Sequence, residues 1–253
     1  MSRILRTKNI SVSFGDNVVL DNVSADFEAG LMTAIIGSNG IGKTTYLKAI
    51  AHLTKAKGTI ELEEDGAASF RKKDIAYVPQ LGNLQTRLTV FEMVLLGLVS
   101  NLKWHVTQEQ TQRVWTTLKD LGIDSIAGQP FHTLSGGQKQ LVSMAQSLVG
   151  RPKVLLLDEP TSALDLKHQL IVMDLAEKYT REQNSVTLFV VHDLMLASRY
   201  GSNLLVLHQA KIHAYDKASR ILTPELLREV YGVESRVLAA EAGYQMVLPL
   251  RPL

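Results

Sequence analysis

Residues 31–44, LMTAIIGSNGIGKT, join an unbroken apolar run to a glycine-rich segment that ends in Lys-Thr. The apolar run has the length and composition of a buried strand, and the residues from Lys43 to about Leu53 have the apolar spacing of a helix. Positions 37–44 match the eight-position phosphate-loop pattern in full, in the strand, loop, helix context that the pattern requires. The stretch therefore predicts a nucleotide-binding α/β fold.

Each residue type in this loop has a separate physical role. The glycines permit backbone conformations closed to other residues, so that successive N–H groups can converge on a phosphate at the positively polarised start of a helix. Lys43 can reach the β- and γ-phosphates, and the Thr44 hydroxyl can ligate Mg²⁺. We expect ATP to be bound by Gly37, Ser38, Asn39, Gly40, Ile41, Gly42, Lys43, Thr44 and Thr45.

A second apolar run, VLLLDEP at 154–160, ends in two carboxylates. Because side chains alternate along a strand, Asp158 and Glu159 are expected to point to different sides and to have different roles. An aspartate at the carboxyl end of a strand can hold Mg²⁺ through water, and a glutamate beside it can orient or deprotonate an attacking water. The alternative, a strand that ends in two solvated acids, is disfavoured beside a complete phosphate loop.

The rest of the chain surrounds these two segments with strands and helices. Residues 1–30 alternate apolar and polar positions and predict short, mainly antiparallel strands. Residues 88–149 have helical spacing and form a block inserted between strands. From residue 153 onward, strands alternate with helices, which predicts a parallel sheet covered on both faces.

The composition limits the class of protein. With 253 residues, 45% of them hydrophobic, the chain can bury a large core, and its 27 basic residues nearly balance its 25 acidic ones. Without a Lys/Arg run, a nucleic-acid partner is not expected. The absence of cysteine excludes disulfides, thiolate metal sites and a cysteine nucleophile. No secretory signal and no apolar run of roughly 18 residues are present, so we expect a soluble, cytoplasmic chain.

Further motifs follow one another in a recognisable order. YVPQ ends at Gln80, LSGGQ occupies 134–138, SALD at 162–165 follows the carboxylate strand, and VVHD contains His192. With the phosphate loop and LLLDEP, this order resembles the nucleotide-binding subunits of ATP-binding cassette (ABC) transporters across almost the whole chain. The resemblance implies an ATPase that uses ATP and Mg²⁺.

The resemblance also implies an architecture. The expected fold is α/β, a P-loop NTPase (RecA-like) core with an antiparallel β subdomain and an inserted α-helical subdomain. Within a single domain, 1–253, the core with its β subdomain would occupy 1–80 and 151–253. The helical subdomain, 81–150, would carry the signature motif LSGGQ.

The signature is a second anion site that the chain's own phosphate loop leaves unused. A serine and two glycines stand at a predicted helix start, where backbone N–H groups bind anions. In the family, two subunits meet head to tail, so that each ATP lies between one phosphate loop and the other subunit's signature. Ser135, Gly136, Gly137 and Gln138 would then serve the ATP of a second copy, through one self-complementary interface. A plain helix cap is the alternative.

Further roles follow from the resemblance. It assigns catalysis to Glu159, His192 and Gln80, Mg²⁺ binding to Thr44, Gln80 and Asp158, and coupling of the two sites across the dimer to Asp165. Phe14 matches an aromatic residue that stacks on adenine, although a lone aromatic side chain is often a core residue. Ser38 and Ile41 depart from the residues common in the family, but neither is expected to touch phosphate through its side chain.

The segment 222–234, LTPELLREVYGVE, indicates a subfamily. It predicts a helix with Thr223 as its N-cap and Pro224 as its first residue. Importers of iron chelates, haem and cobalamin carry a similar segment, so we expect uptake of an iron(III)-siderophore or a related chelate. The partners would be transmembrane permease subunits and, indirectly, a substrate-binding protein, with the chain peripheral at the cytoplasmic side of the inner membrane. A zinc, manganese or molybdate importer, an exporter subunit and a soluble ABC ATPase remain alternatives.

Overall fold

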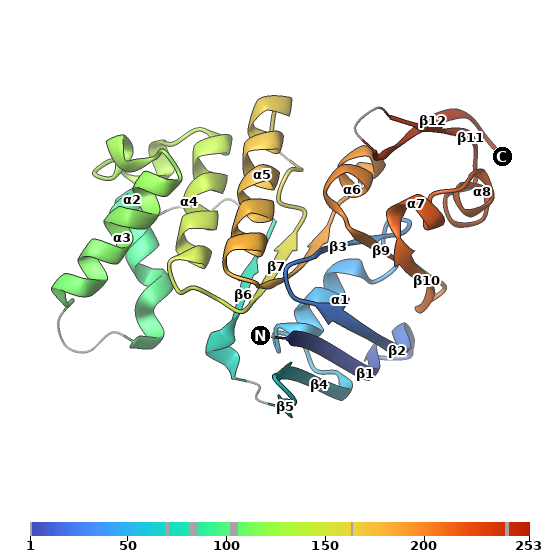
Figure 1. Ribbon diagram of the computed structural model, residues 1–253, viewed down its shortest axis with the longest axis horizontal. Helices are drawn as coiled ribbons and strands as arrows, with labels where there is room; N and C mark the ends of the chain where they lie inside the picture. The colour runs from blue at the N-terminus through green and yellow to red at the C-terminus, as the bar shows by residue number, and fades with distance from the viewer. Residues whose placement is uncertain (1, 69–70, 81–85, 102–105, 163, 241–242) are drawn as a thin grey trace.

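The phosphate loop follows the third strand of a six-stranded sheet at the centre of the molecule (Figure 1). The computed structural model describes residues 2–68, 71–80, 86–101, 106–162, 164–240 and 243–253. In spatial order the sheet contains β10 (Lys211–Lys217), β9 (Asn203–His208), β3 (Met32–Ile36), β8 (Val186–Val190), β7 (Val154–Asp158) and β6 (Ile75–Val78). All neighbouring pairs are parallel except β10 with β9, so the predicted parallel sheet has one antiparallel edge strand.

Two separate cores cover the two faces of this sheet. On one face, helix α1 (Lys43–Ile50) packs between the sheet and an antiparallel sheet whose order is β2 (Asn17–Glu28), β1 (Arg3–Phe14), β4 (Lys57–Glu64) and β5 (Ala67–Ala68). On the other face lie α4 (Gly136–Leu148), α5 (Leu166–Glu182) and α6 (Leu194–Tyr200). Because side chains alternate along a strand, neighbouring apolar residues of β7 point into different cores: Leu156 into the first, and Leu155 and Leu157 into the second.

The helical block extends beyond β6, at the left of Figure 1. It contains α2 (Val90–Leu95), α3 (Gln108–Asp120) and α4, with 3₁₀ turns at η2 (Leu96–Asn101), η3 (Asp124–Ile126) and η4 (Phe131–Thr133). Each of the three α-helices begins with a capping box, in which a Ser or Thr side chain and a Glu or Gln three residues later satisfy each other's backbone N–H groups. Residues 81–85 and 102–105 of the predicted block lie outside the described residues, and its boundaries stay predictions.

The chain ends in a small unit that packs behind the phosphate loop. Helices α7 (Ala218–Ile221) and α8 (Pro224–Tyr231) precede a hairpin of β11 (Val233–Ala239) and β12 (Gln245–Pro252). Helix α8 begins as predicted, because the Thr223 hydroxyl accepts a hydrogen bond from the N–H of Leu226 at 3.2 Å and Pro224 comes first. The hairpin was not predicted from the sequence; it packs on α6 and exposes Leu238, Met246 and Leu248.

The predicted class, an α/β P-loop NTPase core with an antiparallel β subdomain and an inserted helical subdomain, is confirmed. One predicted helix boundary differs, since the helix predicted to end at about Leu53 ends at Ile50. The helix that follows β7 begins at Leu166, because the Asp165 side chain caps it. Among the described residues, the helices are too short or too polar to cross a membrane.

Candidate active site

The phosphate loop is held in a conformation that requires glycine at its ends. Gly37 has φ of 144°, and a Cβ there would lie 2.3 Å from the carbonyl oxygen of Leu207 on β9. Gly42, with φ of 109°, is the N-cap of α1, and a Cβ there would meet Val19 at 3.0 Å. Both positions combine a left-handed backbone with close packing, so any larger residue would displace the loop from the strand.

Lys43 is buried beneath this loop. Its side chain is 5% exposed, and Nζ donates hydrogen bonds to the carbonyl oxygens of Gly37 at 2.8 Å and Ser38 at 2.9 Å. Burial lowers the pKa of Lys43, while the charges of Glu159 and Asp158 act in the opposite direction. The ammonium group is therefore held by carbonyl oxygens close to two carboxylates, in a place where it can meet a phosphate.

Thr44 and Asp158 are brought together from 114 residues apart. The Thr44 hydroxyl donates to Oδ1 of Asp158 at 2.7 Å, and the Tyr77 hydroxyl donates to Oδ2 at 2.7 Å. Asp158 is 4% exposed. A hydroxyl and a carboxylate side by side are the oxygen donors that Mg²⁺ prefers, so the side chains fit the ion that was predicted for them. Burial and the bond to Asp158 raise the pKa of Tyr77, which keeps its hydroxyl a donor.

Glu159 turns away from Asp158 and bonds to the two other predicted catalytic residues. Its Oε1 lies 2.6 Å from Nε2 of His192, and its Oε2 accepts a hydrogen bond from Nε2 of Gln80 at 3.0 Å. Gln80 also donates to the Ser162 hydroxyl at 3.2 Å. Glu159 has φ of 49°, a left-handed conformation that redirects the chain directly after strand β7. Asp158 and Glu159 thus make different contacts, and the different roles expected for them stay a prediction.

These side chains surround a cavity of about 340 Å³. It is lined by Val19, Asn39, Gly40, Gly42, Lys43, Thr44, Thr45, Glu159 and His192. Phe14, proposed to stack on adenine, lies at the end of β1 with 58% of its surface exposed, so it is not a core residue. The cavity thus combines a buried cation, backbone N–H groups at the start of α1 and a carboxylate that is held by His192 and Gln80.

The signature residues do not line this cavity within the described part of the chain. Ser135 is the exposed N-cap of α4 and exchanges hydrogen bonds with Gln138, at 3.0 Å and 3.3 Å. Gly137 packs against the ring of His168 on α5, where a Cβ would lie 2.5 Å from Cδ2. The start of α4 therefore takes no part in the cavity beside the chain's own phosphate loop, and its role as an anion site stays a prediction.

Asp165 lies next to the signature through His168. Its Oδ1 accepts from the backbone N–H of His168 at 2.9 Å and lies 2.8 Å from His168 Nδ1. These bonds, the backbone bond first, lower the pKa of Asp165. The predicted coupling residue is therefore the N-cap of α5, on the same surface as the start of α4.

Three residues of the site were not found from the sequence. Tyr77 and Ser162 contact the carboxylate and glutamine described above. The hydroxyl of Tyr231, at the end of α8, accepts the N–H of Gly37 at 2.9 Å, and burial raises the pKa of Tyr231 to about 12. Tyr77 precedes the predicted YVPQ glutamine and could have been suspected as a polar group at a strand end, whereas Tyr231 gives no local signal.

Comparison with known proteins identifies the class of protein. A family model described as ABC transporter matches residues 20–162. The chain is 35% identical over 254 residues to an uncharacterized ABC transporter ATP-binding protein of Methanocaldococcus jannaschii, covering 98% of both. The chain belongs to the ABC transporter family, and it is an ATPase subunit whose hydrolysis of ATP drives transport.

Two named relatives and two solved structures are similar over most of their length. The petrobactin import ATP-binding protein FpuD of Bacillus anthracis is 32% identical, and the match covers 94% of this chain and 89% of the relative. The hemin import ATP-binding protein HmuV of Vibrio parahaemolyticus is 34% identical, and the match covers 92% of this chain and 93% of the relative. A transporter described as of metal-chelate type, in an inward-facing conformation, superposes with a TM-score of 0.87 at 26% identity, over 99% of this chain and 98% of the other. A dimeric ATP-binding cassette with ADP and Pi gives 0.71 at 29%, over 84% and 98%.

Proposed function

We propose that the chain is the ATPase of an importer that takes up an iron(III)-siderophore or a related metal chelate such as haem or cobalamin. The likeness along nearly the whole chain to a metal-chelate type transporter is the observation that carries the proposal. Relatives named for petrobactin import and hemin import support it. The predicted α8 segment, which suggested the subfamily, forms the helix behind the phosphate loop.

The site residues fit the chemistry of ATP hydrolysis. Lys43 and the N–H groups of residues 37–45 would bind the β- and γ-phosphates, and Thr44, Asp158 and Gln80 would hold Mg²⁺. When bound, the ion neutralises charge that develops on the phosphate oxygens. Glu159 would orient the attacking water and accept its proton at a carboxylate oxygen. His192, now 2.6 Å from Oε1 of Glu159, would hold that carboxylate and contact the γ-phosphate.

A second copy of the chain would complete each site. Ser135 and the N–H groups at the start of α4 do not line the chain's own cavity, and they would bind the γ-phosphate held by a partner. Phe14 would stack on the adenine ring from its exposed position. Asp165, on the same surface, would meet the partner near its phosphate loop.

Closure of this dimer would drive a membrane-embedded permease. The γ-phosphate would bias a two-state element in which Gln80, His192 and the partner's signature converge, and hydrolysis would release it. In this proposal the chain lies at the cytoplasmic face of the cell membrane, held by permease subunits, and a separate binding protein delivers the chelate.

The first experiment is affinity purification of the Glu159→Gln variant from native membranes with ATP and Mg²⁺. Loss of the carboxylate base is expected to lower ATP hydrolysis at least about 100-fold while ATP binding and the closed dimer persist. A permease should co-purify, and proteoliposomes containing the wild-type complex should take up a ⁵⁵Fe-chelate. ATP hydrolysis by Glu159→Gln near the wild-type rate would contradict the proposed role of Glu159 as the catalytic base. A permease that carries zinc or molybdate instead would overturn the proposed substrate.

A further inference from the structure

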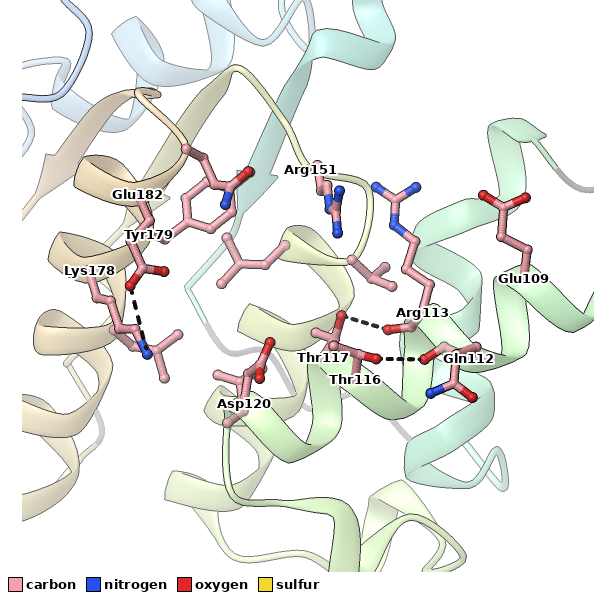
Figure 2. A pocket seen from close by; sticks show the side chains of 15 residues that line it. Glu109, Gln112, Arg113, Thr116, Thr117, Asp120, Arg151, Lys178, Tyr179 and Glu182 are labelled. Carbon is pink, nitrogen blue, oxygen red and sulfur yellow. Dashed lines mark hydrogen bonds and ion pairs between the residues drawn. The ribbon is translucent and has the colours of Figure 1, made fainter.

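A second cavity lies between α3, α5 and the end of α4, at the junction of the helical block and the core (Figure 2). Its volume is about 550 Å³, within the range of small-molecule sites. It contains Arg151 and Gln183, which come just before β7 and β8. The phosphate loop follows the carboxyl end of β3, so this cavity lies at the opposite edge of the parallel sheet and shares no residue with the nucleotide site.

Two arginines stand side by side at one end of this cavity. Figure 2 shows the guanidinium groups of Arg113, from α3, and Arg151, from the segment before β7, next to each other. Nε of Arg113 is buried and has no hydrogen-bond partner in the described part of the chain. Burial and the charge of Arg151 lower the pKa of Arg113, while the charge of Glu109 acts in the opposite direction. Among the described residues, neither guanidinium is ion-paired to a carboxylate.

The remaining walls combine a few aliphatic side chains with polar and charged ones. Leu121, Leu148 and Leu175 contribute aliphatic surface. The Tyr179 hydroxyl donates to the carbonyl oxygen of Pro152 at 2.8 Å, and Lys178 lies 4.0 Å from Glu182. Nε of Arg113 is therefore a buried donor of the cavity whose hydrogen-bonding capacity is unused in the described part of the chain.

We propose that this cavity binds a small organic phosphate monoester. Two adjacent cations repel each other unless an anion lies between them, and a phosphate monoester carries a charge of about −1.5 to −2 at neutral pH that matches the pair. Guanidinium groups bind phosphate oxygens in bidentate fashion. The aliphatic side chains of Leu121, Leu148 and Leu175 fit the organic part of the ester. The carboxylates of Glu109, Asp120 and Glu182, which also line the cavity, disfavour longer polyanions such as nucleotides. Such a ligand would join the helical block to the core.

The test is calorimetric titration of phenyl phosphate into the chain after its phosphate loop has been saturated with ADP and Mg²⁺. Saturation prevents the probe from binding at Lys43. The variants Arg113→Gln and Arg151→Asn are each expected to weaken binding at least about tenfold, because each removes a charge-assisted pair of hydrogen bonds. Asn suits position 151, where φ is 52°, so the backbone is preserved.

The control is Lys119→Gln, which removes the same charge from the exposed side of α3 outside the cavity and should leave binding unchanged. Benzoate, with a single charge, and inorganic phosphate, without an apolar part, should both bind more weakly than phenyl phosphate. Equal binding of phenyl phosphate to the wild type and to both arginine variants, with their ADP affinity intact, would overturn the proposal. So would the absence of binding to the wild type at millimolar concentration.

Discussion

The Tyr231 hydroxyl accepts a hydrogen bond from the N–H of Gly37, the first residue of the phosphate loop, although the two residues are 194 positions apart in the chain. The carbonyl of that same residue, Gly37, accepts from Lys43, so a single residue links α8 to the cation of the nucleotide site. A buried N–H without a partner is costly, and Tyr231 supplies that partner. Tyr231 is therefore a positioning residue that acts on ATP through Gly37.

We predict that Tyr231→Phe weakens ATP binding about tenfold and changes kcat much less. The substitution keeps the aromatic ring in its site but leaves the N–H of Gly37 without a hydrogen-bond partner. An unpaired N–H costs about 1 to 3 kcal/mol, and this cost destabilises the loop conformation that binds phosphate. The measurement is KM and kcat of ATP hydrolysis together with direct nucleotide binding. Tyr244→Phe, in the nearby hairpin, is the control, and an equal loss in both variants would argue against the specific role.

The site residues that could be predicted from the sequence are those whose type and local position indicate a chemical role. Lys43, Thr44, Asp158 and Glu159 stand at strand ends or a helix start, where type and position together indicate a role, and the structure brings them into one region. Tyr231 could not be predicted, because its contact depends on how the last helix packs behind the loop.

At the scale of elements, Glu64 links its own strand β4 to strand β1 and to the segment before β7. It accepts from Nε of Arg3 on β1 at 2.6 Å and pairs with Lys153, just before β7. The hydrogen bond from Lys153 is the main cause that lowers the pKa of Glu64, with Arg3 adding to it. This carboxylate joins the antiparallel sheet to the start of β7, the strand that ends at Asp158.

We predict that Glu64→Gln lowers the free energy of unfolding by about 1 kcal/mol at pH 7. Because the folded-state pKa lies below the unfolded value of about 4.3, the stabilisation is present above that pH and is lost as pH falls through the lowered value. Urea unfolding at a series of pH values should show the wild type and the variant converging below pH ~4. Glu61→Gln, whose partner Lys8 is exposed, should have a smaller effect.

Elements with capping residues and clear periodicity could be predicted, and the final hairpin could not. The boxes at Thr89, Thr107 and Ser135 mark helix starts locally. Strands β11 and β12 instead have apolar residues on the outward face, among them Leu248 and Leu250, which hides the alternation that a half-buried strand normally displays.

At the scale of the whole molecule, the signature does not line the cavity beside the phosphate loop within the described residues, and we proposed above that a second chain supplies it. We predict that mixing Lys43→Ala with Ser135→Arg chains, each inactive alone, restores ATP hydrolysis to about a quarter of the wild-type rate. Random pairing makes about half of the dimers mixed, and each mixed dimer contains one intact site of two. Hydrolysis by either variant alone, or no recovery on mixing, would contradict the head-to-tail arrangement.

Glu159 carries a further consequence, for the selection of variants. Glu159 is a non-glycine residue in the left-handed region, a conformation that costs about 1 kcal/mol or more. The two side chains that bond to Glu159 are exposed, so their hydrogen bonds stabilise the fold too little to offset this cost. Asn or Gly tolerates the same backbone. A library screened for thermal resistance alone should therefore enrich the substitutions Glu159→Asn and Glu159→Gly. We expect both substitutions to abolish ATP hydrolysis, so a screen for growth on the imported nutrient should retain the glutamate.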